Sequence, residues 1–126
     1  MIEKGGEHVT SQQDERALAE ALRLARQEGR VCALATVVAT RGSTPRKVGA
    51  RMLVDPARGL TGTIGGGCGE AEVIQAAGRV IETGVPARVQ VDLTEDILSW
   101  SPAVCGGVMD IYIEAVGAPS RREQAS

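Results

Sequence analysis

The run VCALATVVA, residues 31–39, decides the fold more strongly than any other stretch of this chain. Its residues are small, apolar or β-branched, and it contains no charged residue. A strand that is covered on both faces has this composition, whereas a strand with one face in water alternates between apolar and polar residues. The run therefore predicts a strand over 31–39 with another layer packed on each side.

Helices on either side of this run along the chain can supply the cover. Apolar residues at helical spacing predict a helix over 12–28, and Gly29 favours its C-terminus. The same spacing predicts a second helix over 70–83, which Gly84 and Pro86 end. The apolar positions are Leu18, Ala21, Leu22 and Ala25 in the first helix and Val73, Ile74, Ala77, Val80 and Ile81 in the second.

Shorter apolar or alternating segments predict the other strands, over 51–54, 60–64, 88–93 and 108–116. The segment DPARG, residues 55–59, is typical of a hairpin turn with proline early in the turn. The expected fold is therefore a single α+β domain, with a mixed β-sheet of about five strands packed with two main helices.

Length and composition set the organisation and exclude several classes of function. A chain of 126 residues makes one domain, expected over 11–116 between a flexible N-terminal arm (1–10) and a flexible C-terminal tail (117–126). A net charge of −2 and an aromatic content of 2% argue against nucleic acid as a partner. The sequence has neither a long apolar run nor a signal-peptide pattern, so we expect a cytoplasmic protein without a membrane partner.

The segment TIGGGCGEAE, residues 63–72, places a run of glycines between a predicted strand and a predicted helix. The first N–H groups of a helix lack internal partners and attract anions, and the same field favours the thiolate of Cys68. Glu70 falls in the first helical turn, where it can cap backbone donors. The alternative is structural: the glycines permit tight packing and Cys68 is a small buried hydrophobe.

Basic residues concentrate in the first half of the chain. Between Gly29 and Gly69 the only acid is Asp55. The segment GSTPRKVG, residues 42–49, combines two of the bases with hydroxyl groups in an irregular loop, a composition suited to phosphate. The alternative is a solvated basic face. The six bases of this interval are Arg30, Arg41, Arg46, Lys47, Arg51 and Arg58.

Three cysteines, an odd number, argue against a disulfide framework, and they do not make a zinc site with the lone histidine. Cys32 lies inside the apolar run and is expected to be a core residue. Cys105 is flanked by glycines in AVCGGVMD, residues 103–110, and its composition suits structure and function equally well. We expect the segments 42–47, 65–70 and 105–107 to converge on one concave surface.

Three stretches, GSTPRKVGARMLV, GLTGTIGGGCGEAEVIQAA and CGGVMDIYIEAV, together resemble the N-terminal domain of the XdhC/CoxI family. These are accessory proteins for xanthine dehydrogenase and carbon monoxide dehydrogenase, and the likeness runs from Val31 to Val116. The resemblance implies a chaperone, rather than an enzyme, that binds molybdenum cofactor as molybdopterin or its dinucleotide form. It also implies help with cofactor sulfuration and with delivery to a client molybdoenzyme; a cysteine desulfurase is a further candidate partner. The strand edges of so small a domain favour a homodimer.

The motifs of the family can be matched to this sequence residue by residue, and the match assigns no catalytic residue. The glycine run and Arg46 would hold the pterin phosphate, and Cys68 or Cys105 would face the metal, with Cys68 as the candidate ligand. Thr44 and Gly69 depart from the family pattern, and larger members continue into a dinucleotide-type C-terminal domain. The matched positions are Gly42, Ser43, Pro45 and Arg46, then Gly65, Gly66, Gly67, Cys68 and Glu70, and finally Cys105, Gly106 and Gly107.

Two other functions remain open at this point. Cys68 would be a catalytic thiolate in a sulfur-transfer enzyme that uses it as a persulfide acceptor. Alternatively, the chain keeps the fold as a protein-interaction module and binds no cofactor.

Overall fold

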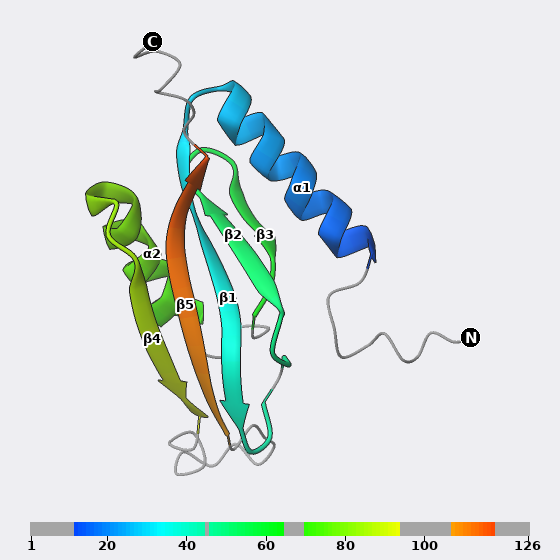
Figure 1. The fold of residues 1–126 in the computed structure, drawn as a ribbon, viewed down its shortest axis with the longest axis vertical. Coiled ribbons are helices and arrows are strands. Elements are labelled where there is room, and N and C mark those ends of the chain that lie inside the picture. Colours follow the sequence, from blue (N-terminus) through cyan, green and yellow to red (C-terminus); the bar gives the residue numbers. More distant parts are fainter. Residues whose placement is uncertain (1–11, 45, 65–69, 94–106, 118–126) are drawn as a thin grey trace.

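A computed structural model describes residues 12–44, 46–64, 70–93 and 107–117 (Figure 1). It confirms the α+β class, both helices and all five strands, with boundaries within two residues of those expected. The expected arm and tail lie outside the described residues, apart from Gly117, which ends the last strand. The elements are α1 (Gln12–Gln27), β1 (Val31–Arg41), β2 (Arg51–Asp55), β3 (Gly59–Gly62), α2 (Glu70–Thr83), β4 (Ala87–Asp92) and β5 (Val108–Gly117).

The five strands form one sheet in the order β3-β2-β1-β5-β4 (Figure 1). All four neighbouring pairs are antiparallel, so the sheet is not mixed as expected. A helix between two strands often joins parallel neighbours. Here α2 joins β3 to β4, which run in the same direction but lie at opposite edges of the sheet and never pair.

The two helices pack on opposite faces of the sheet, and β1 divides its side chains between them. Ala33, Ala35 and Val37 belong to the larger apolar cluster, which includes the buried face of α2. Cys32 and Leu34 belong to the cluster that contains Leu18 and Ala25 of α1. The predicted cover on both faces of β1 is therefore confirmed, as is Cys32 as a core residue.

Helix α2 returns alongside β4, which brings several chain segments to one end of the sheet (Figure 1). Only residues 84–86 separate the two elements, and both are about 20 Å long at ordinary helix and strand rises. The start of α2 therefore lies toward the end of β4. Asp92 pairs with Val108, and Val108 pairs with Arg41. We call this the Arg41 end of the sheet and the opposite end, where β1 begins, the Arg30 end.

Candidate functional site

Gly107 brings two of the three predicted segments together at the Arg41 end. It is buried, and a Cβ atom there would lie 2.4 Å from the carbonyl oxygen of Arg41 and 2.7 Å from that of Ser43. Only a residue without a side chain permits such a close approach of two backbones. The segments 42–47 and 105–107 therefore meet at Gly107. Cys105 and Gly106 lie outside the described residues.

The connection between β1 and β2 is a turn with its own internal bonds. Gly42 and Gly49 have positive φ values of 76° and 102°, which favour glycine. The hydroxyl of Thr44 donates a hydrogen bond of 2.9 Å to the carbonyl oxygen of Arg46. Thr44, the departure from the family pattern, thus helps to close the turn, and Ser43 stays exposed beside it.

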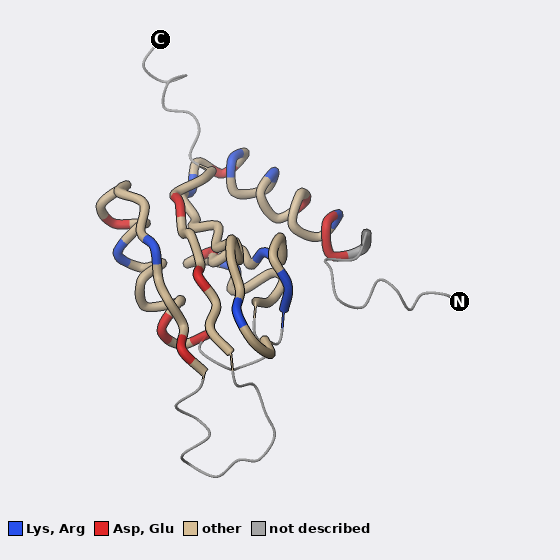
Figure 2. The backbone as a smooth tube through the Cα atoms, turned by 60° about the horizontal axis from the view of Figure 1, so that its bottom comes forward, with Lys and Arg blue, Asp and Glu red and all other residues tan. Residues whose placement is uncertain are grey.

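Three cations belong to this turn or directly precede it, and Figure 2 colours the basic positions of the backbone blue. Arg41 and Lys47 are exposed and Arg46 is half-buried. Within the described parts of the chain, none of the three side chains makes a hydrogen bond or an ion pair. Their charge is therefore available to an anionic ligand.

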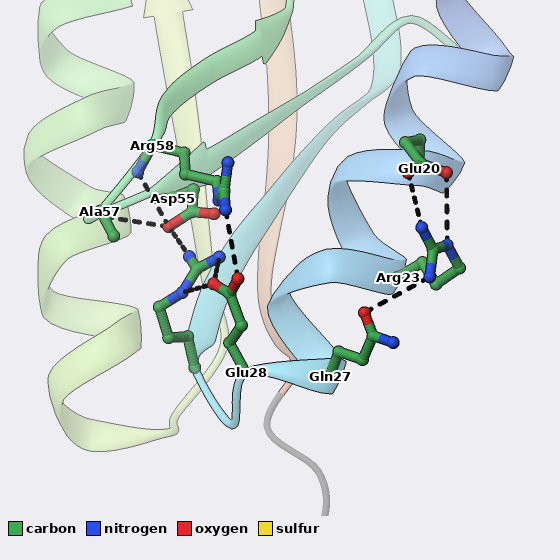
Figure 3. Close-up of polar contacts among 8 residues, drawn as sticks. Glu20, Arg23, Gln27, Glu28, Asp55, Ala57 and Arg58 are labelled. Carbon is green, nitrogen blue, oxygen red and sulfur yellow. Dashed lines mark hydrogen bonds and ion pairs between the residues drawn. The ribbon is translucent and has the colours of Figure 1, made fainter.

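The other three bases of the predicted basic interval are paired with acids. Arg51 binds Glu15 of α1 at 2.5 Å. Arg30 binds Glu28 at 2.7 Å, and the Glu28 carboxylate also accepts a bond of 3.1 Å from Arg58 (Figure 3). Three of the six bases are thus committed to internal contacts, and the bases that pair with no described residue are those at the Arg41 end.

Asp55 is the buried centre of the Arg30 end, with 3% of its surface exposed. Its Oδ1 atom accepts hydrogen bonds from the Arg30 guanidinium and from the backbone N–H groups of Ala57 and Arg58 (Figure 3). Burial opposes ionisation, but these bonds outweigh it and hold the pKa of Asp55 below its usual value. Asp55 therefore closes the β2–β3 turn as a carboxylate.

Cys32 is fully buried near the same carboxylate. Burial, with the negative charge of Asp55, raises the pKa of its thiol to about 11. A thiol with this pKa is protonated at neutral pH and is a poor nucleophile or metal ligand. Any thiol chemistry therefore falls to Cys68 or Cys105, both outside the described residues.

The glycine run is bracketed by two described residues that hydrogen-bond to each other. The hydroxyl of Thr63, after β3, donates a bond of 2.7 Å to the carboxylate of Glu70, the first residue of α2. Glu70 thus anchors the start of the helix, although through a side chain rather than through the backbone donors expected. The sequence analysis missed Thr63, and its position seven residues before Glu70 gave no signal of the contact. The predicted site residues between them, Gly65, Gly66, Gly67 and Cys68, lie outside the described residues.

Among the described residues, no group of three or more histidine, cysteine or acidic side chains is placed to hold a metal ion. The predicted metal ligand, Cys68, is not among those residues.

Neither α1 nor α2, the helices of the described ranges, is long and apolar enough to cross a membrane.

Comparisons with known proteins agree with these motifs. A model of the XdhC and CoxI family matches residues 25–92, which include β1, the basic turn, the glycine run and α2. A Bacillus subtilis protein named as a probable xanthine dehydrogenase subunit is 34% identical over 91 residues, covering 71% of this chain and 28% of that protein. The uncharacterized protein YqeB of Escherichia coli is 34% identical over 89 residues, covering 71% of this chain and 16% of that protein.

A solved structure shares the fold as well as the sequence. The crystal structure of a xanthine dehydrogenase from Bacillus halodurans superposes with a TM-score of 0.65 at 30% identity, covering 82% of this chain and 32% of that one. The chain thus spans less than a third of the length of each of these relatives. The family model matches more than half of the chain, and we conclude that this protein belongs to the XdhC and CoxI family.

Proposed function

We propose that this protein is an accessory factor for the maturation of a xanthine dehydrogenase or a related molybdoenzyme, and that it binds molybdenum cofactor at the Arg41 end. Family membership and the names of its relatives support the accessory role. One observation carries the binding site: Arg41, Arg46 and Lys47, whose side chains pair with no described residue, belong to or precede a turn that packs against Gly107.

The residues at this end suit the phosphate of a pterin cofactor. Arginine and lysine neutralise phosphate, and the exposed hydroxyl of Ser43 can donate a hydrogen bond to it. Of the two acids in residues 63–72, Glu70 already accepts a bond from Thr63. The backbone N–H groups of Gly65, Gly66 and Gly67 would donate further hydrogen bonds to the phosphate, as the family resemblance implies.

The bound cofactor would supply a molybdenum centre whose sulfido ligand the client enzyme needs. Cys68 or Cys105 would face this centre, since Cys32 is buried at the other end of β1 with a protonated thiol. In this proposal the protein works in the cytoplasm, receives sulfur from a cysteine desulfurase and passes the cofactor to the client.

Replacement of Arg46 by alanine tests the cofactor site. A charged hydrogen bond contributes about 1.5–3 kcal/mol, so isolated molybdenum cofactor should bind roughly ten- to a hundredfold more weakly. Binding is followed by absorbance and by molybdenum content at low salt. Arg16→Ala is the matched control, because Arg16 is also an exposed arginine without a partner among the described residues, but it lies on α1.

The outcomes separate the competing functions. Equal binding by Arg46→Ala and the parent, with unchanged melting, would refute the phosphate site. No binding by the parent would favour a protein-interaction module. Cys68→Ser that still binds cofactor but no longer transfers sulfur would favour a sulfur-transfer enzyme.

A further inference from the structure

The basic turn between β1 and β2 is held on its later side by backbone hydrogen bonds. The N–H of Ala50 donates a bond of 3.1 Å to the carbonyl oxygen of Lys47. The N–H of Gly49 donates a bond of 2.9 Å to the carbonyl oxygen of Val37, and the N–H of Val37 donates one of 3.0 Å to that of Ala50. The residues that follow Arg46 are therefore fixed to β1.

Thr44 holds the other side of Arg46 with two different atoms. Its hydroxyl donates a hydrogen bond of 2.9 Å to the carbonyl oxygen of Arg46. Its methyl carbon, Cγ2, lies 2.8 Å from the place where a Cβ atom of Gly107 would stand, so the methyl group packs against the residue before β5. The half-buried side chain of Thr44 thus joins the backbone of Arg46 to the sheet.

A fixed backbone lowers the cost of binding an anion through a long side chain. An arginine loses conformational freedom when its guanidinium binds a ligand, and the loss is smaller where the residue is already held in place. The Arg46 guanidinium pairs with no described residue, so the backbone of Arg46 determines where this group can reach. We propose that Thr44 is a positioning residue that sets Arg46 for the phosphate of the cofactor. This inference rests on the proposed cofactor site and requires no contact between Thr44 and the ligand.

Two substitutions separate the contacts of Thr44. Thr44→Val keeps a methyl group against Gly107 and removes the hydroxyl, whereas Thr44→Ser keeps the hydroxyl. We expect isolated molybdenum cofactor to bind Thr44→Val about three- to tenfold more weakly than the parent, which corresponds to the loss of one ordinary hydrogen bond. Thr44→Ser should lie between the two. Thr83→Val is the matched control and should bind like the parent, because the Thr83 hydroxyl donates a bond of the same 2.9 Å to the carbonyl oxygen of Arg79 in α2.

A double-mutant cycle distinguishes positioning from a general loosening of the fold. If Thr44 acts through the Arg46 side chain, Thr44→Val should weaken binding no further once Arg46 is replaced by alanine. A merely structural contribution would weaken binding equally in both backgrounds. The cofactor-free proteins supply a second readout: NMR order parameters of the Arg46 and Lys47 amides should fall in Thr44→Val and stay at the parent's values in Thr83→Val.

The positioning role and the cofactor site fail on different results. Parent-like binding by Thr44→Val, an undiminished effect in the Arg46→Ala background, or unchanged order parameters would overturn the positioning role and leave the cofactor site in place. A parent that binds no cofactor would overturn the proposed function, and this inference with it.

Discussion

The two ends of β1 carry the same kind of charge and use it differently. At the Arg30 end, Arg30 and Arg58 bind the carboxylates of Asp55 and Glu28. At the Arg41 end, the bases around the turn bind no described residue. The comparison teaches that the number of bases in a segment does not measure its capacity for an anion. What counts is how many of them the fold leaves unpaired.

The difference follows from what the fold brings to each end. At the Arg30 end the α1–β1 connection supplies Glu28, and the end of β2 supplies Asp55. At the Arg41 end the turn packs against Gly107, which has no side chain to offer. We therefore expect substitutions at the Arg30 end to change stability, and substitutions at the Arg41 end to change binding.

The largest effect on stability should come from Asp55→Ala. The substitution removes the acceptor of one guanidinium and two backbone N–H groups, and a charged hydrogen bond of this kind is worth about 1.5–3 kcal/mol. We expect a loss of about 3 kcal/mol in the free energy of unfolding, measured in urea. The exposed partner Glu28, replaced by alanine, is the control and should cost much less. An Asp55→Ala protein as stable as the parent would show that the pairing is incidental.

The pH dependence of unfolding checks the same carboxylate. The pKa of Asp55 is lowered in the folded state, so its contribution is complete above the ordinary aspartate pKa of about 3.9. The contribution is then lost as the pH falls through the lower, folded-state pKa. The parent should therefore lose more stability between about pH 5 and 2 than Asp55→Asn does. Parallel curves for the two proteins would contradict the lowered pKa.

An intermediate effect is expected from Gly107→Ala, which should lower both the stability of the fold and the affinity for cofactor. The new methyl group would collide with two backbone carbonyl groups, and we expect a cost of about 1–3 kcal/mol in stability. Cofactor binding should weaken as well, because the turn of Ser43 must move. Gly78→Ala is the control: its Cβ would meet nothing within 4 Å in α2, and it should stabilise by about 0.5–1 kcal/mol. If both alanines behave alike, the contact at Gly107 does not constrain the turn.

The smallest effects on stability are expected at the Arg41 end itself. Arg41→Ala and Lys47→Ala remove no described contact and should change the free energy of unfolding by less than about 0.5 kcal/mol. Both should nevertheless weaken cofactor binding and reduce its sensitivity to salt. Loss of stability without loss of binding would reverse the roles assigned to the two ends.

The sequence was sufficient to predict the positions of the helices and strands, but not which strands pair and in which direction. Helical spacing followed by Gly84 and Pro86 predicted 70–83, the extent of α2. The apolar run at 31–39 predicted a strand with two covered faces. Strand direction was not predictable in the same way, because a helix between two strands does not reveal that they occupy opposite edges.

The candidate site was less predictable for two physical reasons. Glu28 lies one residue before the interval whose only acid is Asp55, and only the fold brings Glu28 to Arg58, thirty residues later. A glycine that admits a neighbouring backbone also looks the same in sequence as one that admits a ligand. Gly107 admits a neighbouring backbone in the described structure, and its place among the cofactor-binding residues stays a prediction.

The strand order has a consequence for how the chain folds. The central pair, β1 and β5, joins residues 31–41 to residues 108–117, so the middle of the sheet depends on contacts between distant parts of the chain. While the chain is being synthesised, β1 lacks its longest pairing partner, β5, until the residues after β4 have left the ribosome. The central pair of the sheet can therefore form only after residues 108–117 have been synthesised. Such dominance of long-range pairing is associated with folding in milliseconds to seconds rather than microseconds. During that interval β1, the most apolar strand, relies on α1, α2 and β2 for protection from aggregation.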